Sequence, residues 1–564
     1  MRGAFASAGI FASADTLRAV ALMVEFPADD VGSTTGDGTF SSVIDANVLI
    51  FGAEFPSFDS LGNLVDVDTF DVPHDARYFR EQLAYVTQYY REVSYGLQEV
   101  SFDLLDSVFV AANPMAYYGL DDSLGTRQPR LLEEVITMAD GAIDFSLYDA
   151  VYIVHAGVGQ ETDVFGDSEG DLWTTYYSRF DLADALADSG MADSYRGIPT
   201  GDIDAFGDSF YVNEIALIPE SETQDGFAQW LLGVACHMTG RVLGAPSLFD
   251  PTPPSFPNSQ GIGNFGIMGT GLWNSGGILP SPPCAWTKMH LGWLEPLVVR
   301  RDTTLSIAMI EVANDSLPIL VKVPITESEY YLLSNRWPDQ NGDGRFTFTD
   351  VDGDNVLGIF EDSYVGAEFD WSIPEEGSTN GAGLFIWHID EDVIRPFGDF
   401  KDINRVNAEA ERKGVDLEEA DGIQDLDTRA RELNNFGSEF DSWTLSNPSF
   451  DGPVAFGPRT IPDTRTNFDA ATGIEIEVLS ESGPVIEVAI RFNRNENAWL
   501  REAPGGRTRL VGPVTFGATE DEFLYAVYDS TADSTWVSRI QSTSSDIEGW
   551  PRSFAGMATS APIY

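Results

Sequence analysis

One predicted helix constrains the fold of this chain more than any other segment. Residues 225–250 read DGFAQWLLGVACHMTGRVLGAPSLFD, an apolar run with a single His near its middle. We predict a helix from about Gln224 to Leu243, because Gly244 and Pro246 disfavour its continuation. A Pro-rich loop follows at 251–257. A helix with so few polar positions is expected to lie inside the protein.

The residues from His237 to Arg241 have the length of the zinc-protease motif HExxH but lack most of its chemistry. In that motif two His side chains one turn apart bind the metal, and the Glu activates the zinc-bound water. Here Met238 replaces the Glu and Arg241 replaces the second His. A guanidinium offers no lone pair to a metal and stays charged. The residues therefore favour a buried helix with one hydrogen-bonded His over an intact zinc site.

Further motifs follow this helix in order. Gly266–Gly269 includes Met268, and Ala285–Lys288 and Leu291–Pro296 read AWTK and LGWLEP. This order resembles the immune inhibitor A family of secreted bacterial metallopeptidases, which has HExxHxxGxxD, a Met-containing turn and a W-x-K…LGW-x-x-P stretch. The resemblance extends over roughly residues 17–490 and includes four more segments: Tyr90–Gly96, Tyr148–Gly157, Gly383–Asp390 and Lys413–Gly422.

The resemblance implies a metzincin-like fold and one zinc ion, and it assigns roles to five positions. His237 matches the first zinc ligand, Met238 the general base and Arg241 the second ligand. Ser247 stands where the family has its third ligand, an Asp. Met268 matches the Met-turn, which supports the floor of the site without binding metal. Because zinc needs three protein ligands and a water, we expect neither zinc nor proteolysis here.

Two functions of different classes remain. The first is a secreted, catalytically inactive homologue of the immune inhibitor A peptidases that serves as a binding or surface module for a protein or peptide. The second is an active zinc endopeptidase with an unusual metal site. A copy without selected function also fits the sequence. If the first holds, Arg241 replaces the positive charge of the metal and faces carbonyl or carboxylate oxygens, with Asp250 and Glu214 as candidate partners.

A second motif predicts a calcium site. Residues 339–350 read DQNGDGRFTFTD, with oxygen-bearing residues at positions 1, 3, 5 and 12 of a twelve-residue loop and Gly at position 6. The residues expected to bind calcium are Asp339, Asn341, Asp343, Asp350 and, through its carbonyl, Arg345. Acidic turns are common in so acidic a chain, but the Gly and the apolar eighth residue favour calcium with a structural role.

The composition is typical of a secreted acidic protein. The 564 residues include 32 basic and 90 acidic ones, for a net charge of −58. Such a charge repels nucleic acid and anionic membranes. With 43% hydrophobic and 12% aromatic residues, the chain can bury large cores and is not a disordered acidic protein. Lys is scarce beside Arg, which fits either salt adaptation or a GC-rich genome. We find no apolar run that could span a membrane and expect an extracellular or cell-surface location.

We predict an α+β chain in four parts. Residues 1–16 form a signal-peptide remnant with an A-x-A-like site, and 17–297 form the metallopeptidase-like domain. Residues 298–495 form a β-rich domain with the calcium-type loop, and 496–564 the start of a truncated, propeller-like β-repeat. The expected elements are a helix at Asp75–Tyr95 and strands at Thr16–Phe26, Ser146–His155, Ile319–Val323, Tyr330–Leu333, Ile474–Leu479 and Val485–Phe492.

The cysteines and the other His side chains carry weaker signals. Cys236 and Cys284 either form a disulfide or are two buried thiols. His155, at the end of a predicted strand, is either a residue of the cleft or an ordinary strand-end polar group. His388 lies in an apolar strand and is interpreted as a core His. His74 and His290 show no partner in the sequence.

Overall fold

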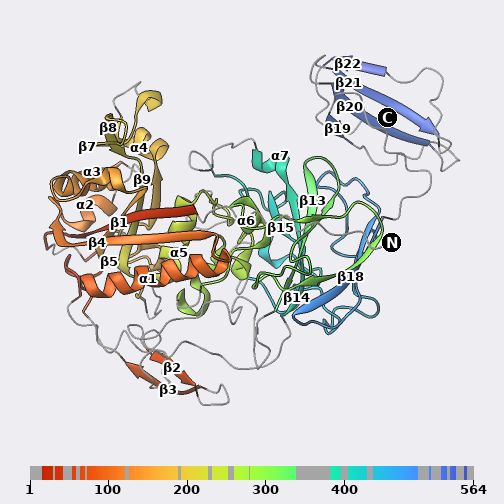
Figure 1. Ribbon diagram of the computed structural model, residues 1–564, viewed down its shortest axis with the longest axis horizontal. Helices are drawn as coiled ribbons and strands as arrows, with labels where there is room; N and C mark the ends of the chain where they lie inside the picture. Colours follow the sequence, from red (N-terminus) through yellow and green to blue (C-terminus); the bar gives the residue numbers. More distant parts are fainter. Residues whose placement is uncertain are drawn as a thin grey trace.

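The computed structural model shows a mixed α/β chain with several separate sheets (Figure 1). It describes residues 15–28, 32–41, 54–58, 64–69, 73–120, 126–187, 192–225, 231–251, 259–277, 280–337, 381–395, 400, 404–427 and 436–492, and four short strands after residue 506.

The first unit is built on a five-stranded sheet with the order β4-β1-β5-β9-β6. The first four of these are parallel to their neighbours, and β6 is antiparallel to β9. Their bounds are β1 Asp15–Glu25, β4 Gln98–Val110, β5 Ala150–Val158, β6 Thr175–Ser178 and β9 Glu214–Ser221. Two hairpins, β2 Glu54–Phe58 with β3 Leu64–Thr69 and β7 Ile198–Ile203 with β8 Ser209–Val212, lie outside this sheet.

Helices cover both faces of the sheet (Figure 1). The helices are α1 Ala76–Val93, α2 Met115–Gly119, α3 Arg127–Ala139, α4 Arg179–Leu186, α5 Leu231–Val242 and α6 Ala285–His290. Alternate residues of β1 enter different cores. Ala21 packs with side chains of α1 and α5, whereas Leu22 packs with those of α3. Every residue of β5 is buried, as expected for a parallel strand covered on both faces.

The predicted helix at 75–95 is confirmed as α1. Asp75 caps it and accepts hydrogen bonds from the backbone N–H groups of Arg77 and Tyr78. The predicted strand at 146–155 begins later, at Ala150. Residues Phe145–Leu147 instead form the short 3-10 helix η1, because Asp144 accepts a hydrogen bond from the Ser146 N–H and caps it.

The second unit is a pair of packed sheets. One has the order β10-β12-β13-β14-β15 and the other β11-β18-β17-β16. Their bounds are β10 Leu297–Val298, β11 Thr303–Ala308, β12 Val321–Pro324, β13 Glu329–Arg336, β14 Gly383–Asp390, β15 Val415–Leu417, β16 Ala455–Phe456, β17 Ile474–Val478 and β18 Val485–Phe492. A short helix, α7 Glu391–Ile394, follows β14. The β-rich character of this half is as predicted.

The β13–β14 sheet is buried on both faces. Leu333 and Ile386 point into the space between the two sheets and pack with Ile476 and Val488. The neighbouring residues Leu332 and Trp387 point the other way and join the core that contains α1 and α5. One continuous apolar core therefore joins the first unit to the second.

Four strands near the C-terminus form a further sheet. They are β19 Arg507–Arg509, β20 Glu522–Asp529, β21 Ser534–Gln541 and β22 Arg552–Ala555. Each pairs antiparallel with the next in sequence order. The sequence predicts a β-repeat in this region, and the structure has a four-stranded antiparallel sheet there.

Candidate functional site

Both ring nitrogens of His237 are occupied. Nδ1 lies 2.8 Å from the carbonyl oxygen of Ile267, and Nε2 lies 3.0 Å from the hydroxyl of Ser247. A carbonyl can only accept, so Nδ1 carries the proton and Nε2 of the neutral ring accepts from Ser247. The pKa of His237 is lowered to about 4, mainly by burial; the Ile267 hydrogen bond opposes this shift, and the Arg241 charge adds to it. The ring is therefore neutral, and its lone pair is held by a hydroxyl.

Arg241 lies on the same helix and contacts backbone oxygens. Its Nη1 donates to the Ala245 carbonyl at 3.2 Å and its Nη2 to the Phe400 carbonyl at 3.3 Å. The guanidinium also lies 5.3 Å from the centre of the Tyr176 ring. Burial lowers the pKa of Arg241, whereas Tyr176, Asp181 and Glu214 raise it. Carbonyl oxygens thus face Arg241 as expected, although they belong to Ala245 and Phe400, and Glu214, one of the two expected partners, acts on the charge electrostatically.

The side chains of Met238 and Met268 both pack in or against the core that contains α1 and α5. Met238 is half-buried against the core of α1 and α5, so a thioether packs where the motif would carry a base. Met268 lies beneath the helix, because a Cβ at Gly240 would stand 2.5 Å from the Met268 sulfur. Its carbonyl accepts the Leu248 N–H at 2.6 Å. The loop that carries Met268 thus packs against α5 at Gly240.

A segment of the second unit closes over this region. Asn404 donates to the Ser247 carbonyl at 2.8 Å, and Asn407 donates to the Leu248 carbonyl at 2.9 Å. Phe400 packs edge-on against Trp286 and His290 and supplies the carbonyl that Arg241 contacts. His237 is only 3% exposed and Ser247 only 8%. The folded chain therefore covers this part of the molecule with its own residues.

The predicted residues of the motif come together, but they do not fit zinc. His237, Ser247 and the Met268 loop are neighbours, and Arg241 brings a cation to the position of a ligand. One imidazole whose lone pair is already accepting a hydrogen bond falls short of the three ligands that zinc requires.

Cys236 and Cys284 are buried free thiols, so the disulfide alternative is wrong. The whole calcium-type loop, residues 339–350, lies outside the described residues.

The remaining His side chains of the first unit are buried or stacked. His155 is fully buried, and burial lowers its pKa to about 4; its Nδ1 lies 3.0 Å from the Ala156 carbonyl. His74 lies 3.0 Å from Glu220 and stacks on Tyr78, a pairing that the sequence did not indicate because 146 positions separate the two. His290 stacks on Trp286.

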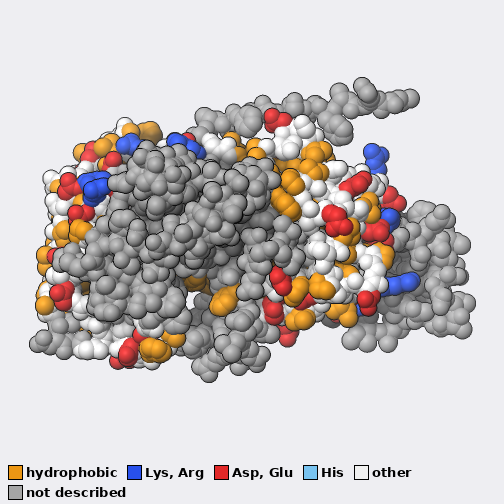
Figure 2. Space-filling model, turned by 90° about the horizontal axis from the view of Figure 1, so that it is seen from below, with side chains coloured by type: hydrophobic (Ala, Val, Ile, Leu, Met, Phe, Trp, Pro, Cys, Tyr) orange, Lys and Arg blue, Asp and Glu red, His pale blue; other side chains and the backbone are white. Residues whose placement is uncertain are grey.

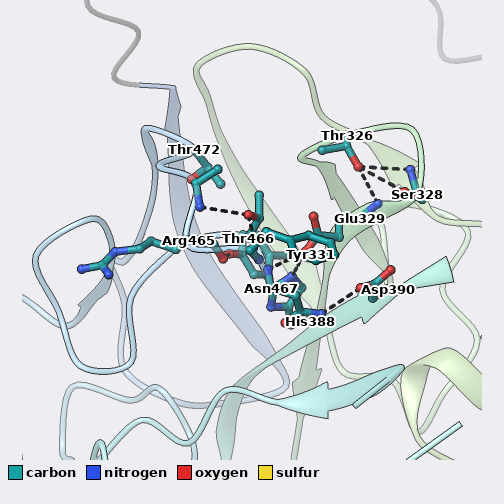
Figure 3. Close-up of polar contacts among 12 residues, drawn as sticks. Thr326, Ser328, Glu329, Tyr331, His388, Asp390, Arg465, Thr466, Asn467 and Thr472 are labelled. Carbon is teal, nitrogen blue, oxygen red and sulfur yellow. Dashed lines mark hydrogen bonds and ion pairs between the residues drawn. The ribbon is translucent and has the colours of Figure 1, made fainter. Parts of the chain in front are cut away.

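His388 lies in a buried ion-pair cluster of the second unit (Figure 3). Its Nε2 is 3.3 Å from Glu329, and its Nδ1 is 3.2 Å from Glu418. Burial alone lowers its pKa, but the two carboxylates outweigh burial and raise it to about 10. Asn467 ties the cluster together by donating its backbone N–H to Glu329 and its side chain to Asp390. The prediction of a core His is confirmed, with the addition that it is charged.

Two groups of carboxylates in the described residues could hold a metal ion, and the sequence analysis missed both. One contains Asp163, Asp167 and Asp225, of which Asp167 is exposed and the other two are half-buried. The other contains Glu419, Asp425 and Asp441 and is largely buried. A signal for the second was present in the run of acidic residues at 416–427, but only the fold brings residue 441 to it.

No protein-family model matches this sequence, and no curated protein matches it. None of the described helices has the length and apolarity required to cross a bilayer. On the face shown in Figure 2, acidic side chains are scattered among apolar and neutral ones, and few basic ones appear.

Proposed function

We propose that this chain is a catalytically inactive homologue of the immune inhibitor A-type metallopeptidases and acts as a secreted or cell-surface binding module for proteins or peptides. The observation that carries the proposal is the Ser247 hydroxyl on Nε2 of His237, beside the Arg241 charge. Nε2 is the nitrogen that would face a metal, because Nδ1 donates to a carbonyl as it does in zinc-bound imidazoles. Here its lone pair accepts a hydroxyl proton instead.

Other features support the peptidase-type origin. The helix with His237 packs behind a mainly parallel sheet with one antiparallel edge strand, and the loop with Met268 passes beneath it. The sequence motifs resemble the family in the same order. The acidic surface supports an extracellular setting rather than contact with nucleic acid.

The first test is zinc content and proteolysis of the purified full chain. We expect no stoichiometric zinc by elemental analysis and no chelator-sensitive cleavage of casein. The variant Met238→Glu/Arg241→His/Ser247→Asp restores the family's base and ligands, and we expect it to bind one zinc ion per chain. The same variant with His237→Ala is the matched control and should bind none. Zinc at His237 in the unaltered protein would establish the active peptidase instead.

Binding without cleavage is the second test. Fluorescence anisotropy with labelled, denatured casein should show saturable binding, and mass spectrometry afterwards should find the casein intact. An absence of saturable binding would reject the binding function, and cleaved casein would reject the loss of catalysis.

A further inference from the structure

The buried carboxylate cluster of the second unit is formed by two loops. Glu419 and Asp425 lie on the segment that follows β15, and Asp441 lies just before Trp443. One carboxylate oxygen from each residue lies within 4.8 Å of the other two. Glu419 and Asp441 both have no exposed surface. Three acidic groups therefore converge inside the protein.

The donors around these groups do not satisfy every oxygen. Glu419 Oε1 accepts the N–H groups of Asp425 and Leu426 at 3.0 and 3.3 Å. Asp441 accepts the N–H and the hydroxyl of Ser438 at 2.6 and 2.9 Å. Glu419 Oε2, in contrast, is buried without a hydrogen-bond partner among the described residues. A buried carboxylate oxygen in this position requires a proton or a cation.

Lys413, the basic side chain that acts electrostatically on Glu419, does not fill this role. Lys413 is fully buried, but its ammonium group contacts Asp416, Asp427 and the Gly261 carbonyl. The three carboxylates therefore converge without a basic side chain bound to Glu419 Oε2 among the described residues.

We propose that Glu419, Asp425 and Asp441 bind one calcium ion. Calcium takes oxygen ligands at about 2.3–2.6 Å, so two oxygens on opposite sides of it lie about 4.8 Å apart. The spacing of the three oxygens meets this limit. All three ligands are carboxylates, and none is a sulfur or nitrogen ligand that would favour zinc or copper. This site is separate from the predicted loop at 339–350.

The bound ion stabilises the 259–277 loop, which contacts His237. Leu426 follows Asp425, and its carbonyl accepts the Gln260 N–H at 2.9 Å. The Phe436 carbonyl accepts the Asn264 N–H at 2.8 Å. Both contacts lead to the loop that carries Ile267, whose carbonyl accepts from His237. The calcium site does not depend on whether α5 once bound zinc.

The test is calcium stoichiometry of the full chain and its variants, by isothermal titration after treatment with chelator. Glu419→Gln and Asp441→Asn should each lower the number of bound calcium ions by one. Asp343→Ala, in the separate predicted loop, should leave the Glu419 site filled. Combined with Glu419→Gln or Asp441→Asn, it should lower the number of bound calcium ions by one more. Terbium(III) provides a second readout, since buried Trp443 donates to the Glu418 carbonyl beside Glu419 and can sensitise terbium emission. We expect calcium to displace the terbium.

The outcomes show whether a cation or a proton occupies the carboxylate cluster. If a proton occupies the cluster, Glu419→Gln imitates the protonated acid and leaves both the stoichiometry and the calcium response of the melting temperature unchanged. That result overturns the proposal. If Glu419→Gln fails to fold by circular dichroism, Asp441→Asn gives the same comparison. Should both fail, an unaltered protein whose terbium emission is absent or insensitive to calcium overturns it as well.

Discussion

At the scale of single residues, burial and neighbouring groups together decide the charge of the two His side chains that matter most. His237 and His388 are both almost fully buried, yet their pKa values move in opposite directions. For His237, burial favours the neutral ring and the Arg241 charge adds to this effect, whereas the hydrogen bond to the Ile267 carbonyl does not offset it. His388 faces two carboxylates, so the charged ring is favoured. Neighbours, rather than depth alone, set each charge.

His237 should make the protein sensitive to acid. Its pKa falls from 6.5 to about 4 on folding, so the stability linked to the neutral ring is complete above pH 6.5 and is lost as the pH falls toward 4. The loss is about 3 kcal/mol at most. We expect NMR to show the His237 resonance neutral down to pH 5, and His237→Gln to flatten this part of the stability curve. A His237 resonance that titrates near 6.5 would contradict the buried position.

His388 should make the protein sensitive to alkali. Its pKa rises from 6.5 to about 10, so the stability linked to the charged ring is complete below pH 6.5 and is lost as the pH approaches 10. At pH 7, His388→Gln leaves Glu329 and Glu418 without their cation and should cost about 3–5 kcal/mol in chemical denaturation. The measurement is made in saturating calcium, so that the Glu419 cluster does not contribute. A variant as stable as the unaltered protein at pH 7 would exclude a charged His388.

At the scale of elements, α5 fits its place because two glycines let other backbone and side chains approach it. Gly240 lies against the Met268 side chain, and a Cβ at Gly233 would overlap the Leu272 carbonyl oxygen of η5, Thr270–Gly277. The Leu272 backbone cannot move aside as the Met268 side chain can. A Cβ is therefore harder to accommodate at Gly233 than at Gly240.

Gly233→Ala should destabilise the protein, by roughly 1–3 kcal/mol or more, because the added methyl forces α5 and η5 apart. Alanine is otherwise the better helix former, so the sign of the change reports packing and not propensity. Gly141→Ala is the control, since a Cβ there meets nothing within 4 Å. Urea denaturation measures both variants. A stabilised Gly233→Ala variant would mean that α5 does not approach η5 this closely.

At the scale of the whole molecule, the two large units share one apolar core. Phe265 of the loop beneath α5 packs edge-on against Phe385 of β14, with ring centres 5.2 Å apart. Trp387 and Leu332 belong to the same core as α1 and α5. We therefore expect the two units to unfold together.

Phe385→Ala tests this coupling. It should cost about 3–5 kcal/mol by leaving a cavity in the shared core. The loss should appear at the same denaturant concentration in two probes, the His237 NMR resonance in the first unit and Trp443 fluorescence in the second. Tyr117→Ala, at a 43% exposed surface position, is the control for truncating an aromatic ring. If the variant shifts only the Trp443 transition, the units are independent.

The sequence by itself determined the elements whose pattern is local. The apolar periodicity at 75–95 and the runs at 16–26, 474–479 and 485–492 gave helix and strands where the structure has them. The residue types of HMTGR alone argue against peptidase chemistry at two positions, because the thioether of Met238 cannot act as the general base and the guanidinium of Arg241 cannot be a zinc ligand. The strand before His155 was placed too early, since the Asp144 cap is a local hydrogen bond that periodicity does not reveal.

Only the tertiary structure decided what lies next to each of these residues. The Ser247 hydroxyl on His237, the Phe400 carbonyl on Arg241 and the pairing of His74 with Glu220 join positions up to 159 residues apart. The free thiols of Cys236 and Cys284 and the convergence of Asp441 on Glu419 are likewise properties of packing. Such contacts depend on how sheets and loops stack in space, and a linear pattern carries no measure of that distance.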